Sequence, residues 1–358
     1  MRFSRRKFAA VAAVGFAIPL VTGVTSANAD DSDQIPTETI DFNELPQGAE
    51  LTTPWLQDNT IHTPDTDLPV GAGLDVTSLA PVGPSQFVAV DDTTGDGSAN
   101  RLVRIENSGT TELAKEPVDT FAVSADGNQV AWTEWTGDSG RVVLADVDTG
   151  RVLHETGIDS EASTAGFVQN KVVLESGANA QVWTPGRGIA DVPEAQAATA
   201  TDAQRGLASV VTRFAEDPET GAQIPCSTVI NTVDDNSKQW SSCEFTPVSF
   251  SPDGRYVWAK DTRADEALPD WMFLVDAQTG EKLRHVKIAF DGTNTSTTQR
   301  VSWEPGGSVV FDVWTGGEMA IVRCSTGAEG GCELATQSAP HEEPVDDAPL
   351  PYMLAERH

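Results

Sequence analysis

Basic side chains are scarce in this 358-residue sequence, which holds 23 lysines and arginines against 54 aspartates and glutamates. The formal charge at pH 7 is −31. Nucleic-acid binders need lysine and arginine for contacts with phosphate, and anionic membrane surfaces attract the same residues. The shortage therefore excludes nucleic acid and an anionic membrane as partners. The acidic excess by itself indicates only a soluble, self-repelling surface.

Long apolar runs are absent after the first 30 residues, so we expect no transmembrane segment once the N-terminus is removed. The N-terminus has the layout of an export signal: a basic patch with Arg5 and Arg6, an apolar stretch, and Ala27-Asn28-Ala29 before an acidic run. The pair resembles a twin-arginine signature, with a Sec signal as the alternative. We predict a signal peptide over residues 1–29, cleaved after Ala29, and a protein secreted or held in the cell envelope.

Common catalytic and cofactor motifs are missing. The sequence has no phosphate-binding loop, no H-E-x-x-H motif, no dinucleotide fingerprint and no G-x-S-x-G nucleophile elbow. Gly137-Asp138-Ser139-Gly140 spells part of a serine-protease motif, but it stands where two strand-like runs need a turn. The five histidines show no metal-ligand spacing. We predict no catalytic residue, no metal and no cofactor, and leave open whether the protein is an enzyme.

One acidic segment is dense in oxygen ligands. Residues Asp91 to Asn100 contain three aspartates around threonine, glycine and serine. A calcium loop needs six to eight oxygens on a sharply turning chain, and the usual D-x-D-x-D-G spacing is absent here. The segment is better interpreted as a polar loop between strands.

Cysteine is limited to four residues in two close pairs. An even number in an exported chain predicts disulfides. Among the three possible connectivities we favour Cys226–Cys243 and Cys324–Cys332, because each bridge would then close one hairpin. A metal site is excluded by spacing, since no C-x2-C pair occurs and no histidine lies close to either pair.

Two turn motifs recur along the chain. Phe250-Ser251-Pro252-Asp253-Gly254 is matched by Val123-Ser124-Ala125-Asp126-Gly127, each followed by a strand-like run. Asp146-Val147-Asp148-Thr149-Gly150 is matched by Asp276-Ala277-Gln278-Thr279-Gly280, again between strand-like runs. Aspartate and glycine supply the polar tip and the permissive backbone that tight hairpins need. Each unit thus holds two hairpins, or four antiparallel strands.

The units recur at intervals of about 36–53 residues, a spacing that suits propeller blades, which need roughly 40–50 residues each. These turns resemble those of TolB-like and WD-repeat-like bacterial β-propellers, over about residues 74–338. The resemblance implies an all-β propeller of four-stranded blades, with seven blades favoured and six as the alternative. We expect an acidic linker over 30–44, the propeller over 45–340 and an acidic, proline-rich tail over 341–358. Residues 351–355 could supply a ring-closing strand.

Two functions remain open for such a propeller. The first is a non-catalytic, monomeric module that binds an unknown protein or carbohydrate through its loops. The second is a glycosidase-like or lactonase-like hydrolase with carboxylates at the channel mouth. We expect candidate ligand-binding residues just before the innermost strands. They are Asp75, Asp119, Glu161, Asp202 and Arg300.

Tryptophan is the other candidate for ligand contact. Trp132 and Trp258 occupy equivalent repeat positions, which predicts packing between blades. Four others lie nearer to turns and could line a carbohydrate or peptide surface. They are Trp135, Trp240, Trp271 and Trp314.

Overall fold

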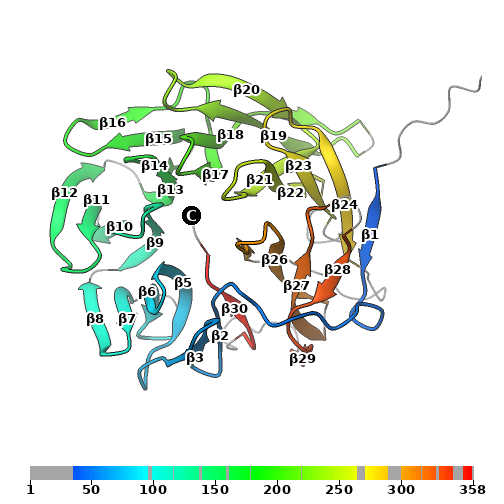
Figure 1. Ribbon diagram of the computed structural model, residues 1–358. Coiled ribbons are helices and arrows are strands. Elements are labelled where there is room, and N and C mark those ends of the chain that lie inside the picture. Colours follow the sequence, from blue (N-terminus) through cyan, green and yellow to red (C-terminus); the bar gives the residue numbers. More distant parts are fainter. Residues whose placement is uncertain are drawn as a thin grey trace, which may run out of the picture. The chain divides into compact units, whose positions relative to one another are not determined.

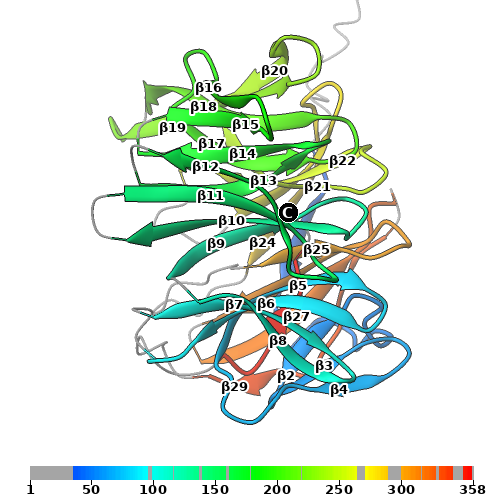
Figure 2. The same ribbon diagram turned by 90° about the vertical axis from the view of Figure 1, so that its left-hand side faces the viewer.

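Seven antiparallel sheets form the blades of a ring (Figure 1), which Figure 2 shows turned by 90°. The computed structural model describes residues 35–95, 99–115, 117–136, 139–158, 161–177, 179–218, 220–263, 271–288, 300–315, 317–327, 330–341 and 350–356. No helix occurs in these ranges, and hence none that could span a membrane. The all-β propeller is confirmed, with seven blades rather than six. The predicted signal peptide lies outside the described residues.

Blade 1 is assembled from both ends of the chain, and the other blades are consecutive. Blade 1 contains β30 (Met353–Leu354), β2 (Trp55–Gln57), β3 (Thr60–His62) and β4 (Asp67–Pro69). Blade 2 contains β5 (Val76–Gly83), β6 (Gln86–Asp92), β7 (Asn100–Glu106) and β8 (Gly109–Ala114). Blade 3 contains β9 (Val118–Val123), β10 (Gln129–Thr136), β11 (Ser139–Asp146) and β12 (Val152–Ile158). Blade 4 contains β13 (Ala162–Val168), β14 (Lys171–Ser176), β15 (Asn179–Thr184) and β16 (Gly188–Asp191).

Blade 5 contains β17 (Ala197–Asp202), β18 (Leu207–Glu216), β19 (Gln223–Asn231) and β20 (Ser237–Ser242). Blade 6 contains β21 (Phe245–Phe250), β22 (Tyr256–Asp261), β23 (Trp271–Asp276) and β24 (Lys282–Ile288). Blade 7 contains β25 (Val301–Trp303), β26 (Val309–Trp314), β27 (Glu318–Cys324) and β28 (Cys332–Leu334). The first strand named for each blade is its innermost (Figure 1). Two short strands are additions: β29 (Ala339–Pro340) pairs with β27, and β1 (Thr37–Ile40) lies parallel to β24. We call the side where inner strands begin the upper face, and the side where they end the lower face.

The segment expected to be a linker contributes β1. Thr37–Ile40 pairs with His285–Ile288 along the outer edge of blade 6. This edge offers unpaired backbone groups, and a short run with β-branched residues can satisfy them. The chain then continues toward blade 1, where the amide of Gly48 donates to the carbonyl of Leu334 over 2.8 Å. The N-terminal segment therefore contacts blades 6 and 7 before it enters blade 1.

The hydrophobic core lies between blades. Each of the seven clusters of buried apolar side chains joins two adjacent blades. Trp132 packs between blades 2 and 3, and Trp258 between blades 6 and 7, with 2% and 1% of their surfaces exposed. The expected role of these two residues is confirmed. Full burial of a large apolar side chain contributes about 1.5–3 kcal/mol, so the packing between blades is the main source of stability.

The repeated turns owe their shape to hydrogen bonds within each motif. The Ser124 hydroxyl donates to the Asp126 carboxylate over 2.6 Å and accepts the Gln129 amide over 3.0 Å. Gly127 has φ +75°, and a Cβ there would lie 2.2 Å from the carbonyl oxygen of Val82 in blade 2. Ser251 and Asp253 repeat the arrangement in blade 6. The hydrogen bond from Ser124 is the main factor that lowers the pKa of Asp126.

Both expected disulfides are formed. Cys226 of β19 is bonded to Cys243, which follows β20, and Cys324 of β27 is bonded to Cys332 of β28. Each bridge joins the ends of one hairpin, as the spacing predicted. Neither therefore links one blade to the next.

Cationic side chains link neighbouring blades through main-chain carbonyls. Arg104 of blade 2 donates to the carbonyl of Val147 in blade 3 over 2.8 Å, and Lys171 of blade 4 donates to that of Thr232 in blade 5 over 2.9 Å. Arginines make the same kind of contact between blades 5 and 6, 6 and 7, and 7 and 1. Arg205 donates to the carbonyl of Asp253, Arg284 to that of Ser325, and Arg323 to that of Ala49. Five of the 23 basic side chains thus help to hold neighbouring blades together.

Ring closure depends on two contacts at the junction of blades 7 and 1. In blade 1, Leu354 pairs with Trp55 and Met353 pairs with Leu56. Beside it, Arg323 of β27 forms a buried ion pair with Glu304, with Nε–Oε2 and Nη2–Oε1 distances of 2.5 and 2.8 Å. Arg323 also donates to the carbonyls of Ala49 and Glu50, just before blade 1. Glu304 accepts the amide of Thr52 over 2.8 Å.

We predict that Arg323→Met destabilises the protein by about 3–5 kcal/mol, because it leaves the Glu304 carboxylate buried and unpaired. Urea unfolding at pH 7 measures the loss, with Lys115→Met, at an 84% exposed side chain, as a control. A loss below about 1 kcal/mol would contradict the proposed importance of the ion pair.

The same pair predicts a pH dependence. Burial raises the pKa of Glu304, but hydrogen bonds from Arg323 and Thr52 and the charge of Arg323 outweigh it, so the net pKa is lowered. The folded state then binds the proton less tightly than the unfolded state, whose glutamate pKa is about 4.3. The resulting stability is present above that pH and disappears as the pH falls through the lower folded pKa. In Glu304→Gln, the decline in unfolding free energy below about pH 5 should be shallower than in the wild type.

Gly140, the last residue of the protease-like tetrapeptide, has a packing role. It pairs with Trp135 across β10 and β11, and a Cβ there would lie 2.7 Å from the Trp135 ring and 2.9 Å from Ile158. Gly140→Ala should therefore cost about 1–3 kcal/mol through overpacking. Gly157→Ala, in the neighbouring strand β12, is the matched control, since its Cβ meets nothing closer than 4.0 Å. Equal unfolding midpoints for the two variants would refute this role.

Candidate functional site

The five residues expected at the channel mouth do not form one group. Asp75 and Arg300 line the same pocket on the upper face. Glu161 is exposed just before β13 and lines neither of the two pockets described below. Asp119 lies in β9, and its side chain is outside the described part of the structure.

Asp202 is at the opposite face, so its expected position before an inner strand was wrong. It is the last residue of β17, because the alanine-rich run that precedes it is itself the inner strand. The Asp202 carboxylate accepts the amides of Gln204 and Arg205 and forms an ion pair of 2.9 Å with Arg205. Its role is to hold the turn after β17.

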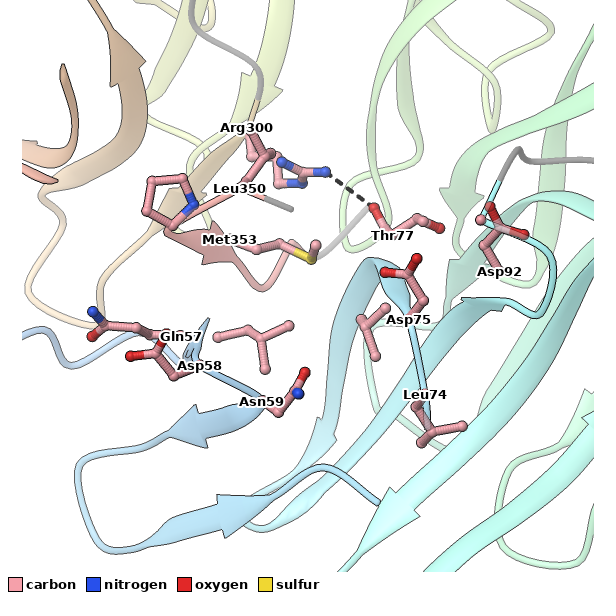
Figure 3. Close-up of a pocket in the computed structure, with 14 residues that line it drawn as sticks. Gln57, Asp58, Asn59, Leu74, Asp75, Thr77, Asp92, Arg300, Leu350 and Met353 are labelled. Atoms are coloured by element: carbon pink, nitrogen blue, oxygen red, sulfur yellow. Dashed lines mark hydrogen bonds between the residues drawn. The ribbon is translucent and has the colours of Figure 1, made fainter. Parts of the chain in front are cut away.

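The pocket on the upper face has a volume of about 630 Å³ and lies where blades 1, 2 and 7 meet (Figure 3). This volume is within the range of small-molecule sites. Its lining comes from segments far apart in the sequence. The lining residues are Leu56, Gln57, Asp58, Asn59, Leu74, Asp75, Val76, Thr77, Asp92, Gly95, Arg300, Leu350, Pro351 and Met353.

Blade 1 contributes a hairpin turn to the pocket. Asp58 and Asn59 connect β2 to β3 and have φ values of +48° and +57°. Aspartate and asparagine tolerate this left-handed conformation better than most residues, and two such residues in succession are typical of tight hairpins. The turn places the carboxylate and the amide at the rim, where both residues are exposed (Figure 3).

Blade 2 contributes two aspartates, Asp75 and Asp92, which form hydrogen bonds within that blade. The amide of Asp75 donates over 2.7 Å to Asp91, whose buried carboxylate forms an ion pair of 2.6 Å with Arg101. Asp92 is also buried, and its carboxylate accepts the amide and the hydroxyl of Thr94 over 3.0 Å each. The inner strand of blade 2 is thereby fixed at its start, and Asp75 remains exposed at the pocket.

Blade 7 contributes Arg300, whose charge is balanced within the protein. Its guanidinium lies 3.5 Å from the buried carboxylate of Asp312 and donates to the carbonyl of Thr77 over 3.0 Å (Figure 3). Its amide also donates to Asp312 over 2.7 Å. Arg300 therefore connects blade 7 to blade 2 across the pocket wall. This structural role is additional to the ligand contact that the sequence predicted for it.

A smaller pocket of about 120 Å³ lies at the lower mouth of the ring. It is lined by the ends of the inner strands and the turns that follow them. These residues are Val123, Ser124, Ala125, Thr201, Asp202, Ala203, Gln204, Phe250, Ser251, Pro252, Ser302 and Trp303. The indole of Trp303 donates to the Ser249 hydroxyl over 3.0 Å. The space is sufficient for one small side chain or a few water molecules.

Two tryptophans expected at a binding surface are buried instead. Trp240 and Trp314 are each less than a tenth exposed, and their indoles donate to the carbonyls of Ala277 and His341. Trp135 and Trp271 are half-buried. None of the four lines either pocket. The described lining of the upper pocket therefore contains no aromatic platform of the kind on which sugars commonly stack.

Metal and acid–base chemistry have little support in the described residues. No three histidine, cysteine, aspartate or glutamate side chains in those ranges are placed to hold a metal ion. Burial raises the pKa of Glu175 in β14, the kind of shift that a general acid needs. Glu175 lines neither pocket, however, so this shift is not part of a candidate active site.

Sequence reasoning missed several residues of the upper pocket. Asp92 belongs to the oxygen-rich segment already noted, part of which (96–98) lies outside the described residues. Asp58 and Asn59 could have been found from their hairpin-turn chemistry, which marks them as loop residues of the upper face. Leu350, Pro351 and Met353 carry no local signal for this pocket, because they line it together with Asp75 and Arg300 only in the closed ring.

No protein-family model matches the sequence, and no curated protein matches it. Many solved structures share the fold. The β-propeller domain of Swd1 (Cps50) from Myceliophteria thermophila has 12% identity and a TM-score of 0.52, with 81% of this chain and 90% of that chain covered. The uncharacterized protein lmo1340 from Listeria monocytogenes EGD-e has 9% identity and a TM-score of 0.51, covering 82% and 86%.

TolB from Acinetobacter baumannii is more distant, with 14% identity, a TM-score of 0.46, and coverage of 75% of this chain and 66% of that chain. The chain also spans 64% of the matched chain of Kuenenia stuttgartiensis hydrazine synthase. At these identities the similarity establishes the fold alone: the chain is a seven-bladed β-propeller.

Proposed function

We propose that this protein is an exported binding module whose ligand or protein partner docks at the upper pocket between blades 1, 2 and 7. The observation that carries the proposal is the pocket itself, a concave site of about 630 Å³ formed by loops of three blades. Propellers commonly bind through such loops, because the blades hold them in fixed positions. None of the described lining residues is aromatic, which favours a protein or small polar ligand over a carbohydrate.

The alternative is a hydrolase, and one feature favours it. Asp75 and Asp92 both line the pocket, from either end of the first hairpin of blade 2. Two carboxylates beside one cavity are the minimum that a glycosidase-like mechanism requires. Turnover of chromogenic glycosides or lactones that disappears in Asp75→Asn would replace the binding proposal with this one.

We predict that a bulky residue at Thr77 blocks the site. Thr77 is an exposed lining residue in β5, so Thr77→Trp should fill part of the cavity without disturbing the core. Ligand-observed NMR with a mixed library of amino acids, short peptides and oligosaccharides should detect binding to the wild type, and at least about tenfold weaker binding to the variant. Thr111→Trp, at an exposed position of the outer strand β8, is the matched control. Binding that survives equally in both variants would place the ligand elsewhere.

The location is also a proposal. Two disulfides within hairpins are compatible with an oxidising compartment outside the cytoplasm. A twin-arginine signal would carry the propeller across the membrane already folded. Replacing Arg5 and Arg6 by lysine should therefore retain the full-length precursor in the cytoplasm, measured by fractionation and immunoblotting. Unchanged export of that variant would favour the Sec alternative.

A further inference from the structure

We propose that the upper pocket takes an aliphatic amine, either a free diamine or the side chain of a lysine. The inference rests on the proposed function, because it assigns a ligand class to the same pocket. The lining combines an aliphatic floor with an acidic rim, and the two features together describe a ligand with an alkyl body and a cationic end.

The floor comes from the closing blade and its neighbour. Met353 and Val76 are buried, and Leu56, Leu74 and Leu350 are partly buried around the same cavity. A solvated acidic surface needs no such floor, and neither does a hydrated metal ion, which prefers oxygen ligands. Apolar walls with a few placed polar groups are the usual composition of sites for organic ligands.

The rim supplies the charge. Asp58 lines the cavity from blade 1 and Asp75 lines it from blade 2, and Figure 3 shows the two residues on opposite sides of it. Arg300 is the one cationic lining residue among those described, and its guanidinium faces the buried carboxylate of Asp312. The rim is therefore net acidic, and an ammonium group is the charge that it would attract.

An alkyl ammonium matches this arrangement better than the alternatives. Its methylene groups can replace water over the leucine and methionine side chains, at about 0.8 kcal/mol per buried CH₂ group. Its charged end can donate to an exposed carboxylate without being desolvated, which avoids the penalty of a buried ion pair. An anionic ligand would be repelled by the rim, and a neutral alcohol would gain from the floor only.

The test uses the mature chain and four small probes at fixed ionic strength, with affinities measured by calorimetry. Cadaverine represents a free diamine, and Nα-acetyl-lysine methylamide represents a lysine side chain. The neutral 1,5-pentanediol and the dianion glutarate have a similar alkyl length. We expect at least one amine to bind about tenfold or more tightly than the diol, with no binding of glutarate. The preferred amine distinguishes a free metabolite from a basic protein segment.

The variants separate a local effect from the overall charge. Asp58→Asn with Asp75→Asn should weaken amine binding at least about tenfold. The matched control is Asp235→Asn with Glu161→Gln, which removes the same charge elsewhere. Asp235 stands in a turn with φ values of +47° and +58°, like that of Asp58, and Glu161 directly precedes an inner strand, like Asp75. Equal amine affinities in the two double variants would overturn the inference.

The remaining outcomes distinguish this inference from the proposed function. Failure of both amines to bind overturns the inference, whatever else binds. Binding of the diol, of glutarate or of a library compound that Thr77→Trp abolishes would then leave the pocket as the binding site, with a different ligand class. Binding of the amines that Thr77→Trp leaves unchanged would overturn both, because the amine site would lie outside this pocket.

Discussion

The fold depends on the closure of the ring between blade 7 and blade 1. Six blades are made of strands that follow one another along the chain, so their hairpins form locally. Blade 1 must bring β30 against β2, which are separated by nearly the whole sequence, and the two strands share only two pairs of residues. Closing so long a loop has an entropic cost that local contacts do not offset. The packing of Met353 and Leu354 against the neighbouring blades and the Arg323–Glu304 ion pair supply what the short pairing lacks.

This requirement also gives meaning to the unusual charge balance. A chain with 54 acidic residues and only 23 basic ones could be expected to repel itself in the compact state. The structure reduces that penalty by placing several cations where they act on backbone carbonyls of the next blade, as Arg104, Arg284 and Arg323 do. Some acids are structural as well: although burial opposes it, amide and hydroxyl donors in the turns lower the pKa of Asp253 and Asp276. These hydrogen bonds favour the ionised carboxylate over the protonated acid, because the charged oxygen is the stronger acceptor.

The sequence was most informative where structure is local. The two turn motifs predicted the blades, and cysteine spacing predicted the disulfides, because in each case the interacting groups are near neighbours in the chain. Prediction failed at Asp202, because the strand that ends there, β17, contains the small residues Ala197 and Ala198, which have weak strand propensity although the strand alternates regularly in burial. A third copy of the D-x-x-T-G turn, at Asp217 to Gly221, was missed because it lies in the middle hairpin of blade 5, between β18 and β19.

The candidate site could not be predicted as a unit, for the same reason that closure is difficult. Asp58, Asp75, Arg300 and Met353 come from four distant segments, and their proximity is a property of the closed ring. Met353 belongs both to the closing strand and to the pocket floor, and Arg300 joins blade 7 to blade 2 at the pocket wall. An open ring would have no such pocket. A ligand held there therefore binds only the closed state, and by mass action it must stabilise the junction on which the other blades depend.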